Sequence, residues 1–167
     1  MTLERPPHIR WFVPDDLPNV LEVEDYNDPA PWSPDRFHDA RRSVSQIIVV
    51  AEIEETLLGF CVYDFVKDKR RPRQEVIEID NLCVHPDYRR QGVASAFITS
   101  LKTKLYRRRR EQILVKVRDG NLPAHLFLAA QGFRAIDVVP RYYSETGDDG
   151  YIFHFHVSQL QEQEAAA

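Results

Sequence analysis

Residues 76–105 read VIEIDNLCVHPDYRRQGVASAFITSLKTKL, and this stretch decides the fold of the chain. Its first part is rich in β-branched and apolar residues, which predicts a strand over Glu75–Val84. A short basic loop with a single glycine, Gly92, comes next. Apolar residues then recur four positions apart across Val93–Leu105, which predicts a long amphipathic helix with one buried face.

The loop between this strand and this helix carries the strongest chemical signal in the chain. The first N–H groups of a helix have no acceptor within the helix, and the helix dipole adds partial positive charge there. Such a position suits a phosphate group, and a glycine lets the backbone approach it closely. The loop lacks the G-K-[ST] of a Walker A motif and the G-x-G-x-x-G of a dinucleotide fingerprint. The sequence therefore predicts a cofactor that carries a pyrophosphate.

Composition indicates an ordinary globular protein, because 43% of the 167 residues are hydrophobic and 29% are charged. This length predicts one domain over residues 1–160, followed by a frayed tail over residues 161–167. The net charge of −4 disfavours a nucleic-acid partner. The chain shows neither a signal-peptide pattern nor an apolar run long enough to span a bilayer, so we expect a cytoplasmic protein with no membrane partner. Cys61 and Cys83 lie in apolar runs, which predicts buried free thiols.

Hydrophobic periodicity outside the central stretch predicts the element order β, α, α, β, β, β, α, β, α, β, β. This order indicates an α/β (α+β) fold with one mixed sheet covered by helices. An acidic turn over residues 53–56 predicts an antiparallel hairpin. Residues 67–73 and residues 141–150 are polar and predict loops. The four arginines at positions 107–110 predict a solvated helix end.

Capping residues predict the limits of two shorter helices. Ser33 followed by Pro34 is a favourable helix start, with the serine as N-cap and the proline at the first helical position. Asn121 similarly predicts the N-cap of a helix, and Gly132 predicts its left-handed stop.

Three motifs in the second half of the chain resemble those of the GNAT superfamily of acetyl-CoA-dependent N-acetyltransferases. The acetyl-CoA signature [QR]-x-x-G-x-[GA] is matched by RRQGVA at residues 89–94. The lead-in V-x-P-x-[YF] is matched by VHPDY at 84–88, and the N-x-x-A…G-F segment by NLPAHLFLAAQGF at 121–133. The PWS of residues 31–33 and the RYY of residues 141–143 are similar to the RimI-type ribosomal-protein N-terminal acetyltransferases.

The resemblance implies a single-domain GNAT fold and acetyl-CoA as the acetyl donor. Such a fold has a mixed, mostly antiparallel sheet flanked by helices on both faces, with a splayed strand pair that holds the cofactor. The basic loop would hold the pyrophosphate, the strand before it would contact the pantetheine arm and the acetyl carbonyl, and Asn121 would add a hydrogen bond. The implied cofactor-binding residues are Leu82, Cys83, Val84, Arg89, Arg90, Gln91, Gly92, Val93, Ala94, Ser95 and Asn121.

The residues that move protons depart from the RimI-type pattern. Lys116 stands where that group has a glutamate base, and Leu128 stands where it has a tyrosine acid. Lysine, with an ordinary pKa of ~10.4, is a poor base at neutral pH, and leucine cannot donate a proton.

Other residues of the chain offer substitutes for the missing pair. Glu78 and Asp80 share one face of their strand, and either could accept the amine proton. The alternative is a structural role, such as a partner for Lys116. Tyr142 and Tyr143 are the candidate proton donors, with hairpin packing as their alternative role.

Three functions remain open at this point, and none of them needs a metal. The first is an N-acetyltransferase whose acceptor is a protein N-terminal amine, and the second is a GNAT enzyme acting on a small-molecule amine. The third is an acyl-CoA-binding module without catalysis. His154 and His156 share a strand face but lack a third ligand, so we expect a structural role for both. A homodimer stays open.

Overall fold

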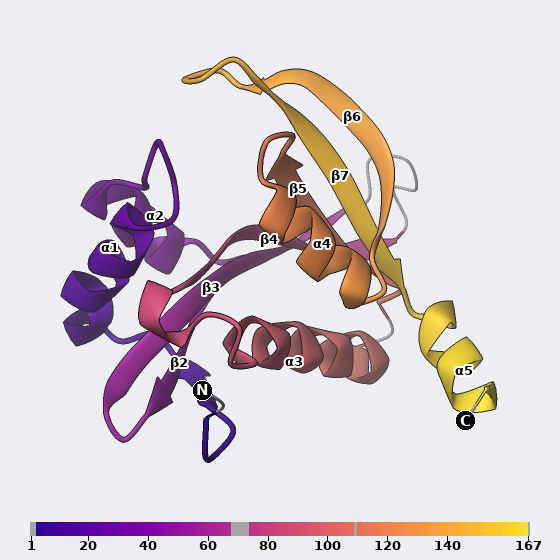
Figure 1. Ribbon diagram of the computed structural model, residues 1–167, viewed down its shortest axis with the longest axis horizontal. Helices are drawn as coiled ribbons and strands as arrows, with labels where there is room; N and C mark the ends of the chain where they lie inside the picture. Colours follow the sequence, from indigo (N-terminus) through magenta and orange to yellow (C-terminus); the bar gives the residue numbers. More distant parts are fainter. Residues whose placement is uncertain (1–2, 68–73, 109, 167) are drawn as a thin grey trace. The chain divides into compact units, whose positions relative to one another are not determined.

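Seven strands form one mixed sheet in the computed structural model, which describes residues 3–67, 74–108 and 110–166 (Figure 1). Hydrogen bonds join the strands in the order β1-β2-β3-β4-β5-β7-β6. The strands are β1 (His8–Trp11), β2 (Gln46–Ile53), β3 (Thr56–Lys67), β4 (Glu75–Val84), β5 (Gln112–Arg118), β6 (Arg134–Tyr143) and β7 (Asp148–His156). The predicted α/β class with a mixed, mostly antiparallel sheet is confirmed, and the splay of one strand pair stays a prediction.

Five α-helices and two 3-10 turns complete the part of the chain that the structure describes. The helices are α1 (Leu17–Asp25), α2 (Pro34–Arg42), α3 (Val93–Arg108), α4 (Leu122–Ala130) and α5 (Ser158–Ala165). The 3-10 turns are η1 (Pro14–Asp16) and η2 (Pro86–Tyr88). In the described part of the chain, no helix is both long and apolar enough to cross a membrane.

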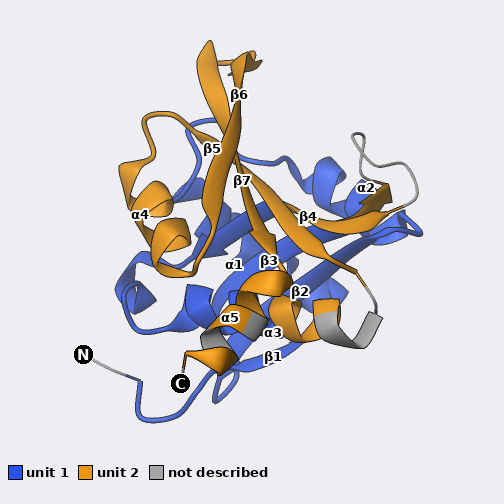
Figure 2. Ribbon diagram, turned by 90° about the vertical axis from the view of Figure 1, so that its right-hand side faces the viewer, with its two compact units in different colours: residues 1–64, 80–100 blue, residues 65–79, 101–167 orange. Residues whose placement is uncertain are grey.

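Two compact units divide the chain (Figure 2). Unit 1 comprises residues 1–64 and 80–100, and unit 2 comprises residues 65–79 and 101–167. Strands β3 and β4 and helix α3 contribute residues to both units. The expectation of one domain over residues 1–160 stays a prediction.

In unit 1, helices α1 and α2 bury their apolar faces against the hairpin of β2 and β3. The ring of Phe37 on α2 meets Phe60 of β3 edge-on at 5.5 Å, and Trp32 lies 5.3 Å from Phe37 on its other side. Burial of one such ring stabilises the fold by about 1.5–3 kcal/mol. The core cluster contains Val20, Val23, Trp32, Phe37, Ala40, Ile48, Val50, Leu57, Phe60, Val62 and Cys83.

In unit 2, helix α4 packs on β7, and β6 and β7 form a long antiparallel hairpin (Figure 1, orange to yellow). The ring of His125 on α4 lies edge-on to Tyr151 at 5.2 Å and to Phe153 at 5.1 Å. Strands β4 and β5 pair in parallel over Ile77–Ile79 and Ile113–Val115. β6 is one of the two edge strands of the sheet, and Pro140 within it is typical of edges that do not pair further.

The predicted capping residues are confirmed. The Ser33 hydroxyl accepts a hydrogen bond from the backbone N–H of Arg36, and Pro34 occupies the first turn of α2. The side chain of Asn121 caps α4 in the same way, and Gly132 is left-handed with φ of +86° just beyond that helix. Cys61 and Cys83 are both buried and free, as the sequence predicts.

Three expectations for polar segments differ from the structure. The loop expected from residue 141 begins only after Tyr143, because β6 continues to that residue and pairs it with Asp148. An exposed edge strand buries little on either face, so it shows no apolar alternation in the sequence. Helix α5 covers most of the tail expected to be frayed, and the Gln159 amide ties it to the Gly132 carbonyl at 2.8 Å.

The arginine run is the third of these differences. Arg110 is paired with Glu75 at 2.8 Å, and its guanidinium stacks on the Phe65 ring at 3.9 Å, so this arginine is not a solvated helix end. Arg109 lies outside the described residues, as do residues 68–73 of the predicted charged loop.

The turn between β2 and β3 yields a stability prediction. Glu54 and Glu55 have φ of +47° and +66°, the left-handed geometry of a type I′ hairpin turn. This geometry costs a non-glycine residue about 1 kcal/mol, so Glu55→Gly should raise Tm by roughly 3 °C in a thermal melt. Glu55→Ala is the matched control, because it removes the carboxylate but keeps the strain. An equal rise in both variants would assign the gain to charge instead of to the backbone.

Candidate active site

The connection from β4 to α3 turns through two left-handed residues. Arg90 has φ of +61° and Gly92 has φ of +89°. Helix α3 begins at Val93, and its first i→i−4 bond among the described residues runs from the Ala96 N–H to the Gly92 carbonyl at 2.9 Å. The N–H groups of Val93 and Ala94 precede that bond and have no acceptor within the helix.

Space beside this connection is open. A Cβ built on Gly92 would meet no atom within 4 Å, apart from its immediate chain neighbours. An anion could therefore reach the N–H groups at the start of α3, where the helix dipole also favours negative charge. The loop thus fits a phosphate group, by its own geometry and independently of the sequence motif.

Arg89 connects the loop to the rest of unit 1 by two hydrogen bonds. Its Nη2 donates to Oδ1 of Asn27 at 3.0 Å, and its Nε donates to the Val84 carbonyl at 3.3 Å. The amide of Gln91 donates to the Asp87 carbonyl at 2.8 Å and steadies the same turn. Both acceptors of Arg89 are neutral, so its positive charge remains available to a nearby anion.

Backbone groups near the end of β4 point in two directions, some toward β3 and others away from it. The His85 N–H donates to the Leu58 carbonyl of β3 at 2.8 Å. The Cys83 carbonyl oxygen lies so close to β3 that a Cβ added to Gly59 would be 2.5 Å from it. Both residues therefore direct backbone groups at β3. The Val84 carbonyl accepts from Asn27 and Arg89, at 3.3 Å in each case. Because backbone groups alternate along a strand, Leu82 directs its N–H and carbonyl away from β3.

A buried carboxylate lies beside this strand end and was missed by the sequence analysis. Glu24 of α1 is fully buried and accepts hydrogen bonds from Asn81 of β4 and from the backbone N–H of Trp32. The thiol of Cys83 lies 3.2 Å from the same carboxylate. Burial, and after it the charge of Glu24, raises the pKa of Cys83 well above its usual value, so this thiol keeps its proton. The one sequence signal is that Glu24 follows the buried Val20 by four residues, on the buried face of the helix.

In unit 2, the candidate base Glu78 is paired with Lys116. The ammonium of Lys116 on β5 contacts the Glu78 carboxylate of β4, and it also lies 5.4 Å from the centre of the Tyr142 ring. The structure therefore brings Glu78, Lys116 and Tyr142 together. The pairing of Glu78 with Lys116 is the structural alternative that the sequence leaves open for this glutamate.

The remaining candidate residues have other neighbours. Asp80 belongs to unit 1 and accepts a hydrogen bond from the Gln46 amide at 2.9 Å. Tyr143 stacks with Tyr142 edge-on at 5.0 Å, and the guanidinium of Arg118 lies over its ring at 3.9 Å. Tyr142 is exposed at the end of the β6–β7 hairpin, whereas Tyr143 is partly covered.

The residues near the start of α4 have mainly structural contacts. Oδ1 of Asn121 accepts from the Ala124 N–H at 3.2 Å, which is the capping bond that the sequence predicts. Nε2 of His125 lies 2.8 Å from the Arg118 carbonyl, which requires the proton on Nε2. Leu128 is buried, so the residue at the position of the missing tyrosine belongs to the core.

Histidines on β7 also have local partners. Nδ1 of His156 lies 2.9 Å from the Ser158 hydroxyl, and His154 lies beside Gln112. Within the described residues, no group of three or more His, Cys, Asp or Glu side chains could hold a metal ion.

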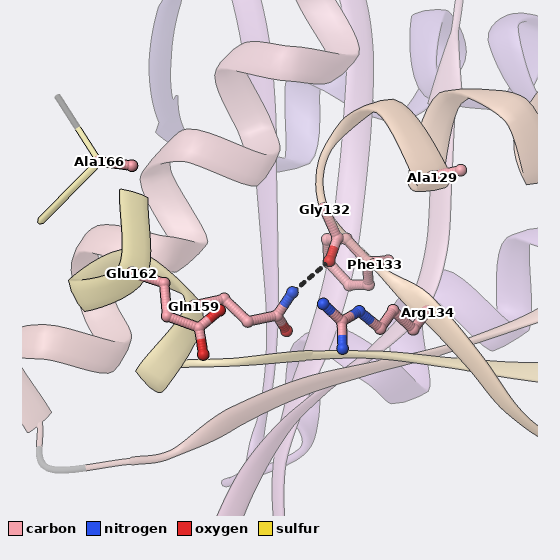
Figure 3. A pocket seen from close by; sticks show the side chains of 7 residues that line it. All are labelled: Ala129, Gly132, Phe133, Arg134, Gln159, Glu162 and Ala166. Carbon is pink, nitrogen blue, oxygen red and sulfur yellow. Dashed lines mark hydrogen bonds between the residues drawn. The ribbon is translucent and has the colours of Figure 1, made fainter. Parts of the chain in front are cut away.

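A pocket in unit 2 lies between α5 and the end of α4 (Figure 3). The side chain of Gln159 spans part of it to reach the Gly132 carbonyl. The pocket is lined by Ala129, Gly132, Phe133, Arg134, Gln159, Glu162 and Ala166. None of these lining residues is one of the predicted site residues.

Comparison with known protein families identifies the class of protein. Residues 9–133 match the acetyltransferase (GNAT) family, and this match covers most of the chain. The chain is 32% identical over 117 residues to an acetyltransferase of Yersinia pestis, an alignment that spans 68% of this chain and 77% of the relative. The same values hold for an acetyltransferase of Yersinia pseudotuberculosis. The chain therefore belongs to the GNAT family of acetyltransferases and is an acyltransferase enzyme.

Solved structures of similar fold align with most of this chain. The ribosomal-protein-S18-alanine N-acetyltransferase of Escherichia coli is 22% identical, with a TM-score of 0.76 over 90% of this chain and 94% of that one. Ard1 of Thermoplasma volcanium is 22% identical, with a TM-score of 0.80 over 92% and 99%. NAA60 of Arabidopsis thaliana, in complex with a bisubstrate analogue, is 18% identical, with a TM-score of 0.80 over 90% and 97%. At these identities the likeness establishes the shared fold.

Gly59 yields a prediction about the strand end. Its missing side chain lets β3 approach the Cys83 carbonyl, and a Cβ there would be 2.5 Å from that oxygen. Gly59→Ala should therefore push β4 aside and destabilise the protein by about 1–3 kcal/mol in denaturant unfolding. Gly120→Ala is the matched control, because a Cβ at Gly120 meets nothing within 4 Å. Equal loss of stability in both variants would show that the close approach at Gly59 carries no special cost.

Proposed function

We propose that the protein is an N-acetyltransferase that moves an acetyl group from acetyl-CoA to the α-amine of a protein N-terminus. The observation that carries this proposal is the left-handed turn at Gly92 that opens onto the start of α3. The two free, buried thiols of Cys61 and Cys83 support a reducing compartment, and we place the enzyme in the cytoplasm.

The loop would hold the pyrophosphate of the cofactor. The backbone N–H groups at the start of α3 would donate to the phosphate oxygens, and Arg89 and Arg90 would add positive charge. The backbone of Leu82 would bind the acetyl carbonyl and the pantetheine arm, since it faces away from β3. Asn121 would add a hydrogen bond to the cofactor. Acetyl-CoA, when bound, supplies the acetyl group as an activated thioester.

Two carboxylates compete for the role of proton acceptor. Attack by an amine requires that the nitrogen lose a proton, and a carboxylate can take that proton directly or through one water. Glu78 is the better candidate, because Lys116 holds its carboxylate in one orientation on the sheet. Asp80, next along the same strand face, is the alternative.

The tyrosines at the end of the β6–β7 hairpin are the proposed proton donors. Tyr142 is exposed and lies next to Lys116, so its hydroxyl can approach a ligand on that side of the sheet. Tyr143 is packed between Tyr142 and Arg118 and has less freedom to reorient. We therefore assign the acid role first to Tyr142.

The acceptor is the open part of the proposal. Similar folds in an S18-alanine N-acetyltransferase and in NAA60 with a bisubstrate analogue favour a protein N-terminus. A small-molecule amine is the second candidate, and it is favoured by Lys116 and Leu128, which replace the base and the acid of the RimI-type pattern. The purified enzyme should release CoA when acetyl-CoA is mixed with a library of N-terminal peptides. Turnover only with polyamines, amino sugars or amino acids would select the second candidate, and no CoA release with either set would refute both.

A substitution at Gly92 tests the cofactor site. Gly92→Glu places a carboxylate and a side chain where the phosphate is proposed to lie, and φ of +89° also disfavours it. Binding of acetyl-CoA, measured by calorimetry, should fall by about a hundredfold or more. Gly147→Glu is the control, because Gly147 has a similar φ of +78° and open surroundings far along the chain. Unchanged affinity in Gly92→Glu would exclude the loop as the phosphate site.

Substitution of the two carboxylates separates the candidate bases. Glu78→Gln should lower kcat by about 10²-fold or more if Glu78 accepts the proton, with little change in the affinity for acetyl-CoA. Asp80→Asn, measured in parallel, should retain most of the activity. The reverse pattern would transfer the role to Asp80, and full activity in both variants would remove both residues from the mechanism.

A further inference from the structure

Glu24 is a fully buried carboxylate in unit 1, with a relative exposure of 0%. It lies on α1 beside Val20 and Val23, which belong to the apolar core of that unit. Burial of an ionised carboxylate is costly unless hydrogen bonds replace its water. Hydrogen bonds from neighbouring groups must therefore compensate for the water that the Glu24 carboxylate loses on burial.

The groups around Glu24 are all hydrogen-bond donors. Asn81 places its amide nitrogen 3.0 Å from both carboxylate oxygens, and the Trp32 backbone N–H donates to Oε1 at 3.0 Å. The Cys83 thiol completes the set at 3.2 Å from Oε2. Among the described residues, no basic side chain forms an ion pair with Glu24. A carboxylate, which only accepts, matches this set of donors, whereas a carboxamide would direct an N–H at one of them.

The three partners belong to two segments of unit 1. Trp32 precedes α2, while Asn81 and Cys83 lie two residues apart on β4, so their side chains share one face of that strand. Two attachments about 7 Å apart prevent the strand from rotating about its own axis. The residue between them is Leu82, whose backbone points away from β3.

We propose that Glu24 is a positioning residue for acyl transfer. Its carboxylate fixes Asn81 and Cys83, and thereby sets the direction of the N–H and carbonyl of Leu82, which the proposed function assigns to the acetyl group. The proposal rests on that function. Loss of the carboxylate would leave the Trp32 N–H and the Asn81 amide buried without an acceptor, so Glu24 contributes to stability as well as to orientation.

The test compares Glu24→Gln with Asp16→Asn. Asp16 is the other buried carboxylate among the described residues, and it binds Arg10 and the Val13 N–H at 2.8 Å, away from β4. Both variants are isosteric and both should lower Tm. In Glu24→Gln, kcat should fall by about tenfold or more while KM for acetyl-CoA changes less than about threefold, because misorientation affects the reacting group more than the remote contacts. Asp16→Asn should keep kcat within about twofold once the folded fraction is matched.

A second readout does not depend on turnover. Amide hydrogen exchange of His85, whose N–H donates to the Leu58 carbonyl of β3, should become at least about tenfold faster in Glu24→Gln and should be unchanged in Asp16→Asn, since only the first loosens the end of β4. The double variant Glu24→Gln/Asn81→Asp restores a donor facing an acceptor, and it should recover a good part of the lost kcat. If Glu24→Gln does not fold, Asn81→Ala, which removes one partner, is measured in its place.

The outcomes separate the two proposals. Equal effects of the Glu24 and Asp16 variants on kcat and on His85 exchange would reduce Glu24 to a structural residue and overturn the inference. Absence of acetyl transfer by the unaltered protein would refute the proposed function, while the exchange of the His85 amide would still decide whether Glu24 orients β4.

Discussion

The end of β4 is held from three directions, and the candidate site depends on that restraint. On one edge, Gly59 lets β3 approach the Cys83 carbonyl. On one face, Glu24 binds the side chains of Asn81 and Cys83. At the end of the strand, Asn27 and Arg89 both donate to the Val84 carbonyl. A strand held in this way can present a backbone hydrogen-bonding edge with little reorganisation, which is the condition for tight recognition of a reacting carbonyl.

Cofactor binding and proton transfer are proposed to depend on different parts of this chain, the first on the backbone and the second on side chains. The proposed phosphate site uses backbone geometry, with left-handed residues that place helix N–H groups beside open space. The candidate proton-transfer groups are side chains, and they are already engaged with each other through the ion pair of Glu78 with Lys116 and the ring of Tyr142. The first device tolerates substitution of most side chains around it. The second depends on individual residues, and it is the part that departs from the RimI-type pattern.

Local chemistry explains why much of the fold could be predicted from the sequence. The strand and helix around Gly92 have clear apolar periodicity, and Ser33 and Asn121 form capping bonds within three residues of themselves. The continuation of β6 through Tyr143 could not be predicted in this way, because an edge strand with both faces exposed has no buried side to mark. Helix α5 could not be predicted for a related reason, since the Gln159 amide ties it to a carbonyl 27 residues away in the sequence.

The sequence predicts the part of the candidate site that consists of consecutive backbone groups. It does not predict the contacts between residues far apart in the chain. The loop residues follow one another in the sequence, so a short motif describes them. Glu24 is 57 residues from Asn81 along the chain, and nothing near it in the sequence signals that a carboxylate is needed. The pairing of Glu78 with Lys116 was one of two open interpretations, and only the register of β4 with β5 selects it.

Both cysteines of the chain, Cys61 and Cys83, lie in unit 1 and are buried there. Burial raises the pKa of both thiols, so the folded protein offers no reactive thiolate. A thiol-specific reagent can react only after unit 1 has opened, whereas the opening of unit 2 leaves no signal of this kind. The natural sequence thus carries an intrinsic reporter for the half of the chain that holds the proposed phosphate loop. The rate of labelling measures how often that half opens, without any introduced probe.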